Sequence, residues 1–310
     1  MKLMIRPYPL DDETLVSYYY RLSHLNCIPI RSLIHPKMLT KNYQFDDKLA
    51  STCLNKELHL GLKDEAVLSL CGRQFIDFHN HFHPLALYIS PKFCPLCLME
   101  ANYYRMKWLI KLNIVCLKHG VFLLQRCSFC KAAFDQLKLL NGRCSCGRYI
   151  SEMQVHEAND DSVFSQKLVE FMMGYNPKPI DDYHPVFSLP RLVFLEFVHH
   201  ILSYVIFYLK LNSAKIIKKN NGDIEFLSEV WNYTITTLKD WPKSFHEFVF
   251  NLLKAYEESY PKRQLSSNIY HARSYLRGFG NQYAFFRQEI CSLESCVDKV
   301  LLAKFFGMHH

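Results

Sequence analysis

The chain has 310 residues, of which 49% are hydrophobic and 15% aromatic. This is enough apolar material for two or three domains, each with its own core, and it excludes an intrinsically disordered protein. The formal net charge of +8 is modestly basic, and by itself it gives only weak support for a nucleic-acid partner.

Residues 1–90 are predicted to form an N-terminal helical domain. A first helix is indicated by apolar residues that recur at helical spacing, namely Leu15, Tyr18, Tyr19, Leu22 and Leu25. We expect Asp11 or Asp12 to cap it and the helix to end near Asn26. Pro29 and Pro36 then bracket a short apolar piece. This order is compatible with a helix-turn-helix, although the same pattern is common in any small helical domain.

Residues 91–150 are predicted to form a tandem zinc-binding module. Seven of the twelve cysteines fall in this stretch together with one histidine. The first predicted site consists of Cys94, Cys97, Cys116 and His119. The second predicted site consists of Cys127, Cys130, Cys144 and Cys146. Each site is a pair of close ligand pairs, so the spacing predicts two Zn²⁺ ions per chain, both in closed and therefore structural sites.

Disulfides and redox chemistry are the alternatives to metal at these spacings. The first residues, Met1 to Pro7, lack the apolar core of a signal peptide, so we expect a reducing cytoplasm, where such cysteines favour metal. The remaining cysteines are predicted to be ordinary buried thiols: Cys27, Cys53, Cys71, Cys291 and Cys296. A third metal site on His79, His81 and His83 is also conceivable, but Phe78 and Phe82 favour packing there.

The zinc module is unusually basic for its size. Between Lys92 and Ile150 there are ten Lys or Arg residues against Glu100 and Asp135. Such a distribution suits phosphate, although a solvated face that offsets thiolate charge would look the same. Three aromatic residues of the first site, Tyr103, Tyr104 and Trp108, are expected to pack over the metal rather than stack on bases.

Residues 151–190 are predicted to be a connector and residues 191–310 a C-terminal helical domain. The apolar segment Leu192–Leu211 is nearly long enough to span a bilayer, but its two histidines and its charged residues favour a buried core helix, so no membrane partner is expected. A further helix is expected after Asp240 and Pro242. Its apolar stripe is Phe245, Phe248, Val249, Leu252, Leu253 and Tyr256.

The sequence contains no constellation that indicates catalysis. It has neither a GxxxxGK[ST] phosphate loop nor a GxSxG nucleophile motif. Its acidic pairs are too scattered along the chain to nominate a two-metal nuclease. We therefore expect that the protein is not an enzyme. Four arginines are the candidate DNA contacts, two in the zinc module and two in a basic and aromatic tail: Arg143, Arg148, Arg273 and Arg277.

Several of these motifs together resemble the TniQ family of transposon target selectors. The resemblance rests on Phe93 to Leu98, Tyr104, Trp108, Cys116 to Gly120, Leu123, Leu124 and Cys127 to Cys130. It extends to the N-terminal pattern of Arg6 to Pro9, Asp12 to Leu15, Ser17, Arg21, Leu22 and Asn26. In the C-terminal part, Trp241, Pro242 and Phe245 are similar to a family segment. The resemblance is strong over about residues 5 to 150.

The resemblance implies an accessory protein of Tn7-like bacterial transposition that performs no strand chemistry. Such proteins select a target site in double-stranded DNA, or act as adaptors on a CRISPR Cascade-type complex, and recruit an AAA+ ATPase transposition regulator. A second copy of the chain is a further candidate partner, and the bacterial cytoplasm, at the nucleoid, is the expected location. The fold that follows is mainly α-helical, with an N-terminal helix-turn-helix-like region, small zinc-finger elements and a C-terminal helical domain.

Overall fold

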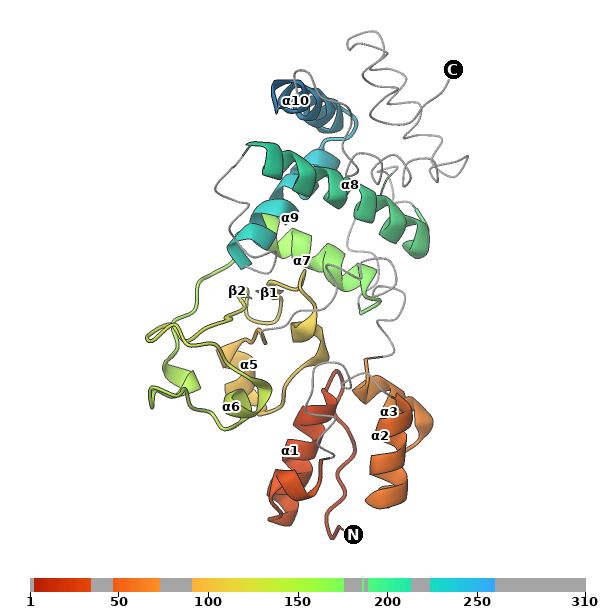
Figure 1. Ribbon diagram of the computed structural model, residues 1–310, viewed down its shortest axis with the longest axis vertical. Helices are drawn as coiled ribbons and strands as arrows, with labels where there is room; N and C mark the ends of the chain where they lie inside the picture. The colour runs from red at the N-terminus through yellow and green to blue at the C-terminus, as the bar shows by residue number, and fades with distance from the viewer. Residues whose placement is uncertain are drawn as a thin grey trace. The chain divides into compact units, whose positions relative to one another are not determined.

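The computed structural model describes residues 3–34, 47–72, 91–175, 186, 189–212 and 224–259. The chain divides into two compact units, Met1–Lys178 and Pro179–His310. Both are mainly helical, and the described strands form a single two-stranded sheet in the first unit (Figure 1). The predicted fold class is confirmed: the structure is mainly α, with two clusters of Cys and His side chains that could hold metal ions.

Helix α1, Leu15–Asn26, is the helix predicted from the N-terminal apolar spacing, but its predicted cap is wrong. Thr14 caps it: the residue is extended and its side chain accepts the N–H of Ser17 at 3.2 Å. Asp12 does not take this role, because it has a left-handed φ of 60° and its carboxylate accepts the N–H of Lys107 instead. The helix ends at Cys27, whose backbone adopts a left-handed conformation and whose side chain is exposed. The prediction that Cys27 is buried is therefore also wrong.

The core of the N-terminal part forms between α1 and the helices that follow it. These are α2, Asp47–Ser51; the π-helix η3, Thr52–Glu57; and α3, Asp64–Leu70. The predicted inward face of α1 is buried in this core, except that Leu25 is 44% exposed. Cys53 and Cys71 are buried in it, as predicted. The apolar piece after Pro29 contains the short 3-10 turn η1, Ile30–Ser32, and the helix-turn-helix stays a prediction.

The cysteine-rich part packs onto α1 within the same unit. Its elements are α5, Pro95–Glu100; η5, Met106–Leu109; the antiparallel pair β1, Val115–Cys116, and β2, Val121–Phe122; α6, Gln136–Leu140; and η6, Ile150–Glu152. Helix α6 contacts α1, and the hydroxyl of Thr14 donates to the side-chain oxygen of Gln136 at 2.9 Å. The cap of α1 is therefore tied to a helix 122 residues further along the chain.

Lys92 is a fully buried lysine in this part of the core. Its ammonium group donates to the carbonyl oxygens of Ile110, Lys111 and Asn113, each at 2.6 Å. Burial lowers the pKa of Lys92 well below its usual value. Tyr104 donates its hydroxyl to the carbonyl of Lys92, and its ring meets that of Trp108 edge to face at 5.2 Å. Tyr104 and Trp108 are thus buried packing residues and not available to stack on bases.

Helix α7, Asp160–Met172, forms within the predicted connector. It is capped by Asn159, whose side chain accepts the N–H of Ser162. Its buried Gln166 accepts the N–H groups of Ile114 and Val115 at 2.9 and 3.0 Å, so α7 fixes the start of β1. The finer division into residues 1–90, 91–150, 151–190 and 191–310 stays a prediction.

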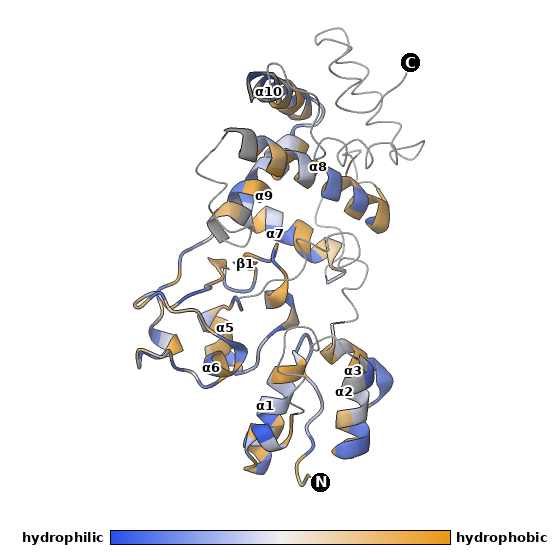
Figure 2. Ribbon diagram, in the orientation of Figure 1, coloured by the Kyte–Doolittle hydropathy of each residue, from blue (hydrophilic) through white to orange (hydrophobic). Residues whose placement is uncertain are grey.

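The second unit contains α8, Arg191–Asn212; α9, Ile224–Lys239; and α10, Lys243–Ser259, which contact one another. Residues Arg191–Leu209 of α8 are long and apolar enough to cross a membrane by length and composition (Figure 2). Half of this stretch is buried inside the structure. Pro242 directly precedes α10, and Asp240 accepts the N–H of Ser244 through its backbone carbonyl. The described members of the predicted stripe, Phe245, Phe248, Val249 and Leu252, are buried.

Asp12 combines a strained backbone with a buried carboxylate. Its Oδ1 accepts the N–H of Lys107 and the hydroxyl of Tyr175, whereas its buried Oδ2 finds no donor among the described residues. Burial raises the pKa of Asp12 from 3.8 to about 6, although the hydrogen bond from Tyr175 and the charge of Lys107 oppose the shift.

Asp12→Asn is expected to stabilise the protein at neutral pH. The raised pKa means that the folded state holds a proton that the unfolded state releases between about pH 4 and 6, so stability falls as pH rises through this window. Asparagine carries no charge and tolerates a left-handed φ, so it should remove this loss, on the order of 3 kcal/mol. Urea unfolding from pH 4 to 8 measures it, with the exposed neighbour Asp11→Asn as control. Parallel pH curves for Asp12→Asn and the original chain would refute the assignment.

Candidate metal centres

The first predicted set of ligands converges on one point. Cys94 stands directly before α5, Cys97 lies in its first turn, Cys116 lies in β1, and His119 follows in the turn to β2. The four donor atoms lie within 4.8 Å of one another. His119 Nδ1 is 3.4, 3.3 and 3.5 Å from the sulfur atoms of Cys94, Cys97 and Cys116. The sulfur atoms of Cys97 and Cys116 are 3.5 Å apart.

The second predicted set converges in the same way. Its four sulfur atoms also lie within 4.8 Å of one another. Cys127 is 3.8 Å from Cys146, and Cys130 is 3.5 Å from Cys144, between sulfur atoms. Cys127 and Cys144 are buried, whereas Cys130 and Cys146 are exposed. Cys144 and Cys146 are separated by one residue, whereas the other close pairs are separated by two. This shorter and less common spacing is thus compatible with a four-donor cluster.

Backbone turns hold these donors in place. Gly120 has a φ of 64° and donates its N–H to the carbonyl of Cys116 at 2.8 Å. Gly147 has a φ of 87° and donates to the carbonyl of Cys144 at 2.9 Å. Glycine adopts this left-handed geometry without steric cost, so each turn closes tightly behind its donor pair.

The donor distances fit a tetrahedral metal ion. Thiolates bound at about 2.3 Å and an imidazole nitrogen at about 2.0 Å place neighbouring donors roughly 3.5 to 3.8 Å apart around a tetrahedron. The observed separations of 3.3 to 3.8 Å agree, and they are far longer than the roughly 2 Å of a disulfide bond. Sets of three thiolates with an imidazole, and of four thiolates, match the preference of Zn²⁺.

The sulfur atoms are also too close to remain ordinary thiols. The hydrogen bond that Cys97 donates to Cys116 raises the pKa of Cys97, and the hydrogen bonds that Cys116 accepts from Cys94 and Cys97 lower the pKa of Cys116. A divalent cation would allow all the sulfur atoms to ionise.

Two of the four candidate DNA-contacting arginines lie on the surface of the second site. Arg143 and Arg148 are both exposed. The guanidinium carbon of Arg143 is 4.2 Å from the ring centre of Tyr149, to whose hydroxyl it also donates. Arg148 lies 5.0 Å from the ring centre of Phe129 and 3.6 Å from the carboxylate of Glu152. Arg273 and Arg277 lie outside the described residues, as do His79, His81, His83, Cys291 and Cys296.

Sequence reasoning missed the rings against which these arginines rest. Phe129 and Tyr149 are each 45% exposed, and each ring lies against the guanidinium group of one of these arginines. The signal was present in the sequence, because each ring stands within two residues of a cysteine or an arginine of the second site. Charge and cation–π contacts together hold the arginines close to the protein surface.

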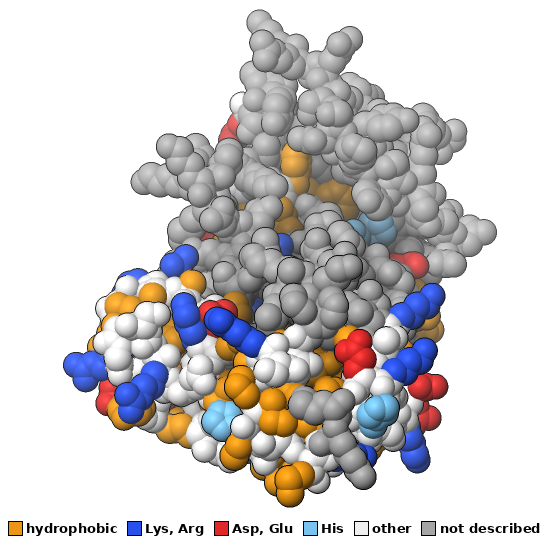
Figure 3. Space-filling view, turned by 60° about the horizontal axis from the view of Figure 1, so that its bottom comes forward, with side chains coloured by type: hydrophobic (Ala, Val, Ile, Leu, Met, Phe, Trp, Pro, Cys, Tyr) orange, Lys and Arg blue, Asp and Glu red, His pale blue; other side chains and the backbone are white. Residues whose placement is uncertain are grey.

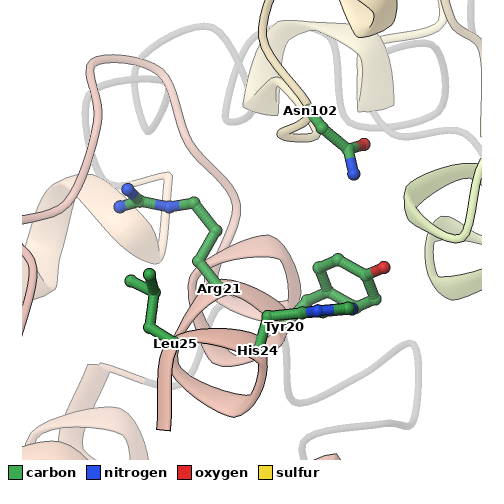
Figure 4. A pocket seen from close by; sticks show the side chains of 5 residues that line it. All are labelled: Tyr20, Arg21, His24, Leu25 and Asn102. Carbon is green, nitrogen blue, oxygen red and sulfur yellow. The ribbon is translucent and has the colours of Figure 1, made fainter. Parts of the chain in front are cut away.

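An exposed apolar strip runs along α1. Met4 is 95% exposed, Ile5 46% and Tyr8 64%, and two hydrogen bonds between Ile5 and Asn26 hold this segment against the helix. An open pocket of about 280 Å³ adjoins the same helix (Figure 4). It is lined by Tyr20, Arg21, His24, Leu25 and Asn102. Figure 3 shows apolar side chains in the middle of one face of the protein, with Lys and Arg side chains on both sides of them.

Comparison with known proteins finds a family match for the N-terminal part of the chain. A family model described as TniQ matches residues 4–123, which include α1 and all four donors of the first site but none of the second. No curated protein matches the chain significantly. The N-terminal pattern and the first donor set, which the structure packs into one unit, thus fall within a single recognised domain. Residues 4–123 thus match a TniQ domain, which is the domain of a family of proteins associated with Tn7-like transposition.

Proposed function

We propose that the protein selects target sites for a Tn7-like transposon, by binding double-stranded target DNA and recruiting an AAA+ transposition regulator. The observation that carries this proposal is the TniQ domain at residues 4–123. The two four-donor clusters, as structural zinc sites, also support the proposal. A zinc ion in each cluster would hold rigid the short loops that a small helical unit could not hold by packing alone.

We propose that this protein does not itself cut or join DNA strands. Each cluster offers four protein donors to its metal ion, which leaves no position for a reactive water. The zinc sites would therefore shape the binding surface, and the chemistry would belong to the transposase that the regulator brings.

The second site supplies the candidate DNA surface. Arg126, Lys131, Arg143 and Arg148 are exposed around it, although a zinc ion with four thiolates carries a net charge of about −2 that offsets part of their charge. Arg143 is the strongest candidate for a phosphate contact, because Glu152 partly neutralises Arg148. Arg273 and Arg277 remain candidates from the sequence alone.

A salt titration tests this surface. Binding to the attachment-site duplex and to a scrambled duplex is measured for the original chain and for Arg143→Gln, Arg148→Gln, Arg273→Gln and Arg277→Gln. Losing a phosphate contact should weaken binding to both duplexes and reduce the logarithmic salt slope by about 1. A base-reading arginine should instead relax preference at one position, at a cost of roughly 1–3 kcal/mol. Arg31→Gln, an exposed arginine of η1, is the matched control.

The alternative is an adaptor bound to a CRISPR Cascade-type complex. The exposed apolar strip of Met4, Ile5 and Tyr8 favours a protein partner, since neighbouring exposed apolar side chains are typical of protein–protein contacts. Equal and weak binding to both duplexes at physiological salt would contradict direct DNA selection and favour the adaptor. Genes for CRISPR components beside the transposase genes would support the same choice. In either case we expect the protein to act in the bacterial cytoplasm, at the nucleoid, alone or as a homodimer.

A further inference from the structure

Both ring nitrogens of His119 have a defined neighbour. Nδ1 faces the three sulfur atoms of the first site at 3.3 to 3.5 Å. Nε2, on the opposite side of the ring, lies 3.0 Å from Oε1 of Glu100. The ring itself is largely buried, with 15% of its side chain exposed. A carboxylate therefore lies directly behind the predicted metal ligand.

This arrangement decides which ring nitrogen carries the proton. A neutral imidazole has one N–H donor and one acceptor nitrogen, and only the acceptor can bind a metal. A carboxylate at Nε2 accepts a hydrogen bond and so keeps the proton there, which leaves the lone pair of Nδ1 directed at the sulfur cluster.

We infer that Glu100 is a positioning residue of the first metal site, which selects the tautomer and the ring orientation of His119. The inference rests on the proposed metal site and deepens it. Its placement in the chain supports it: Glu100 ends α5, three residues after the ligand Cys97, so one short helix carries both a ligand and the support of another. The second carboxylate oxygen pairs with Lys118, the neighbour of His119, and this contact holds Glu100 in place.

The competing explanation is an ordinary surface ion pair. Glu100 is 45% exposed on its side chain and Lys118 61%, and pairs this exposed contribute little to stability. The second site provides a matched comparison, because Glu152 is 42% exposed and pairs with Arg148 at 3.6 Å. Glu152 thus has the same charge as Glu100, a similar exposure and a similar ion pair with a basic residue, but only Glu100 also contacts a predicted ligand, at Nε2 of His119.

Site-resolved zinc protection separates the two explanations. The full chain, without a histidine tag, is equilibrated at a series of buffered free Zn²⁺ concentrations and pulsed with N-ethylmaleimide, and the modified cysteines are mapped by mass spectrometry. The midpoint of protection is read separately for Cys94, Cys97 and Cys116 and for the four cysteines of the second site. The variants are Glu100→Ala, Glu100→Gln and Glu152→Ala.

Glu100→Ala should raise roughly 10-fold the free Zn²⁺ concentration at which the cysteines of the first site are half protected, and it should leave that of the second site unchanged. A 10-fold change is the lower end of the range for residues that hydrogen-bond to a metal ligand. Glu100→Gln should shift the first-site midpoint less, because its amide oxygen still accepts from Nε2. Glu152→Ala should shift neither site. An unchanged first-site midpoint in Glu100→Ala, an equal shift at both sites, or equal shifts in the Ala and Gln variants would overturn the inference. Failure of zinc to protect the original chain would instead overturn the proposed metal site.

Discussion

Cys97→Ala is expected to unfold the part of the first unit that surrounds its first metal site, rather than to remove an activity from a folded protein. Cys97 is 2% exposed and shares its cluster with donors from β1 and from the following turn. Binding of structural zinc contributes on the order of 10 kcal/mol to folding, so loss of one ligand should cost several kcal/mol. Limited proteolysis and thermal unfolding of the purified chain measure the effect.

Cys53→Ala is the control for this substitution. Cys53 is 1% exposed and therefore as buried as Cys97, but it lies in the apolar core of the N-terminal helices and outside both clusters. We expect about 1 to 2 kcal/mol of destabilisation from the small cavity. Equal destabilisation by the two substitutions would argue that Cys97 is only a core residue.

Lys92→Met is expected to destabilise the first unit by about 3 kcal/mol or more. Methionine reproduces the apolar stem of lysine, but it removes the donor that the carbonyls of Ile110, Lys111 and Asn113 share, and of these the Ile110 carbonyl still accepts the N–H of Asn113 at 3.0 Å. Each unsatisfied buried carbonyl costs about 1 to 3 kcal/mol, and some relaxation toward water will reduce the sum. Urea unfolding at constant zinc concentration gives the difference.

Lys131→Met serves as the comparison for Lys92. Lys131 is exposed and donates to a single carbonyl, that of Ser128, at 2.9 Å. Its loss should change the free energy of unfolding by less than about 0.5 kcal/mol. If the two lysine variants unfold at the same urea concentration, the buried ammonium group has no structural role.

Local patterns in the sequence were enough to predict the donors and the helices α1, α8 and α10, but not α7, which lies in the predicted connector. Ligand spacing identified both four-donor clusters, because each close pair lies on one turn and needs no long-range information. The apolar periodicity of α1 and α10 was also a local signal. Contacts far apart in the chain were not predictable: Lys92 bonds carbonyls 18 to 21 residues away, and Gln166 of α7 reaches β1 across 51 residues.

The failed predictions have the same cause. Aspartate is a residue type that often caps helices, but the carboxylate of Asp12 forms hydrogen bonds with Lys107 and Tyr175 instead. Thr14 therefore caps α1. Cys27 looks like any apolar thiol, but it occupies the left-handed end of α1 and is exposed. Glu100 was visible only as one of two acids in a basic segment until the fold brought it to His119.

The count of zinc ions in the purified chain tests the central claim most directly. Untagged full-length protein, prepared without chelators, is analysed by native mass spectrometry and by elemental analysis of the same sample. The two clusters, each with four converged donors, predict two zinc ions per chain. Soluble, folded protein that contains one zinc ion or none would contradict the assignment of both clusters as structural metal sites.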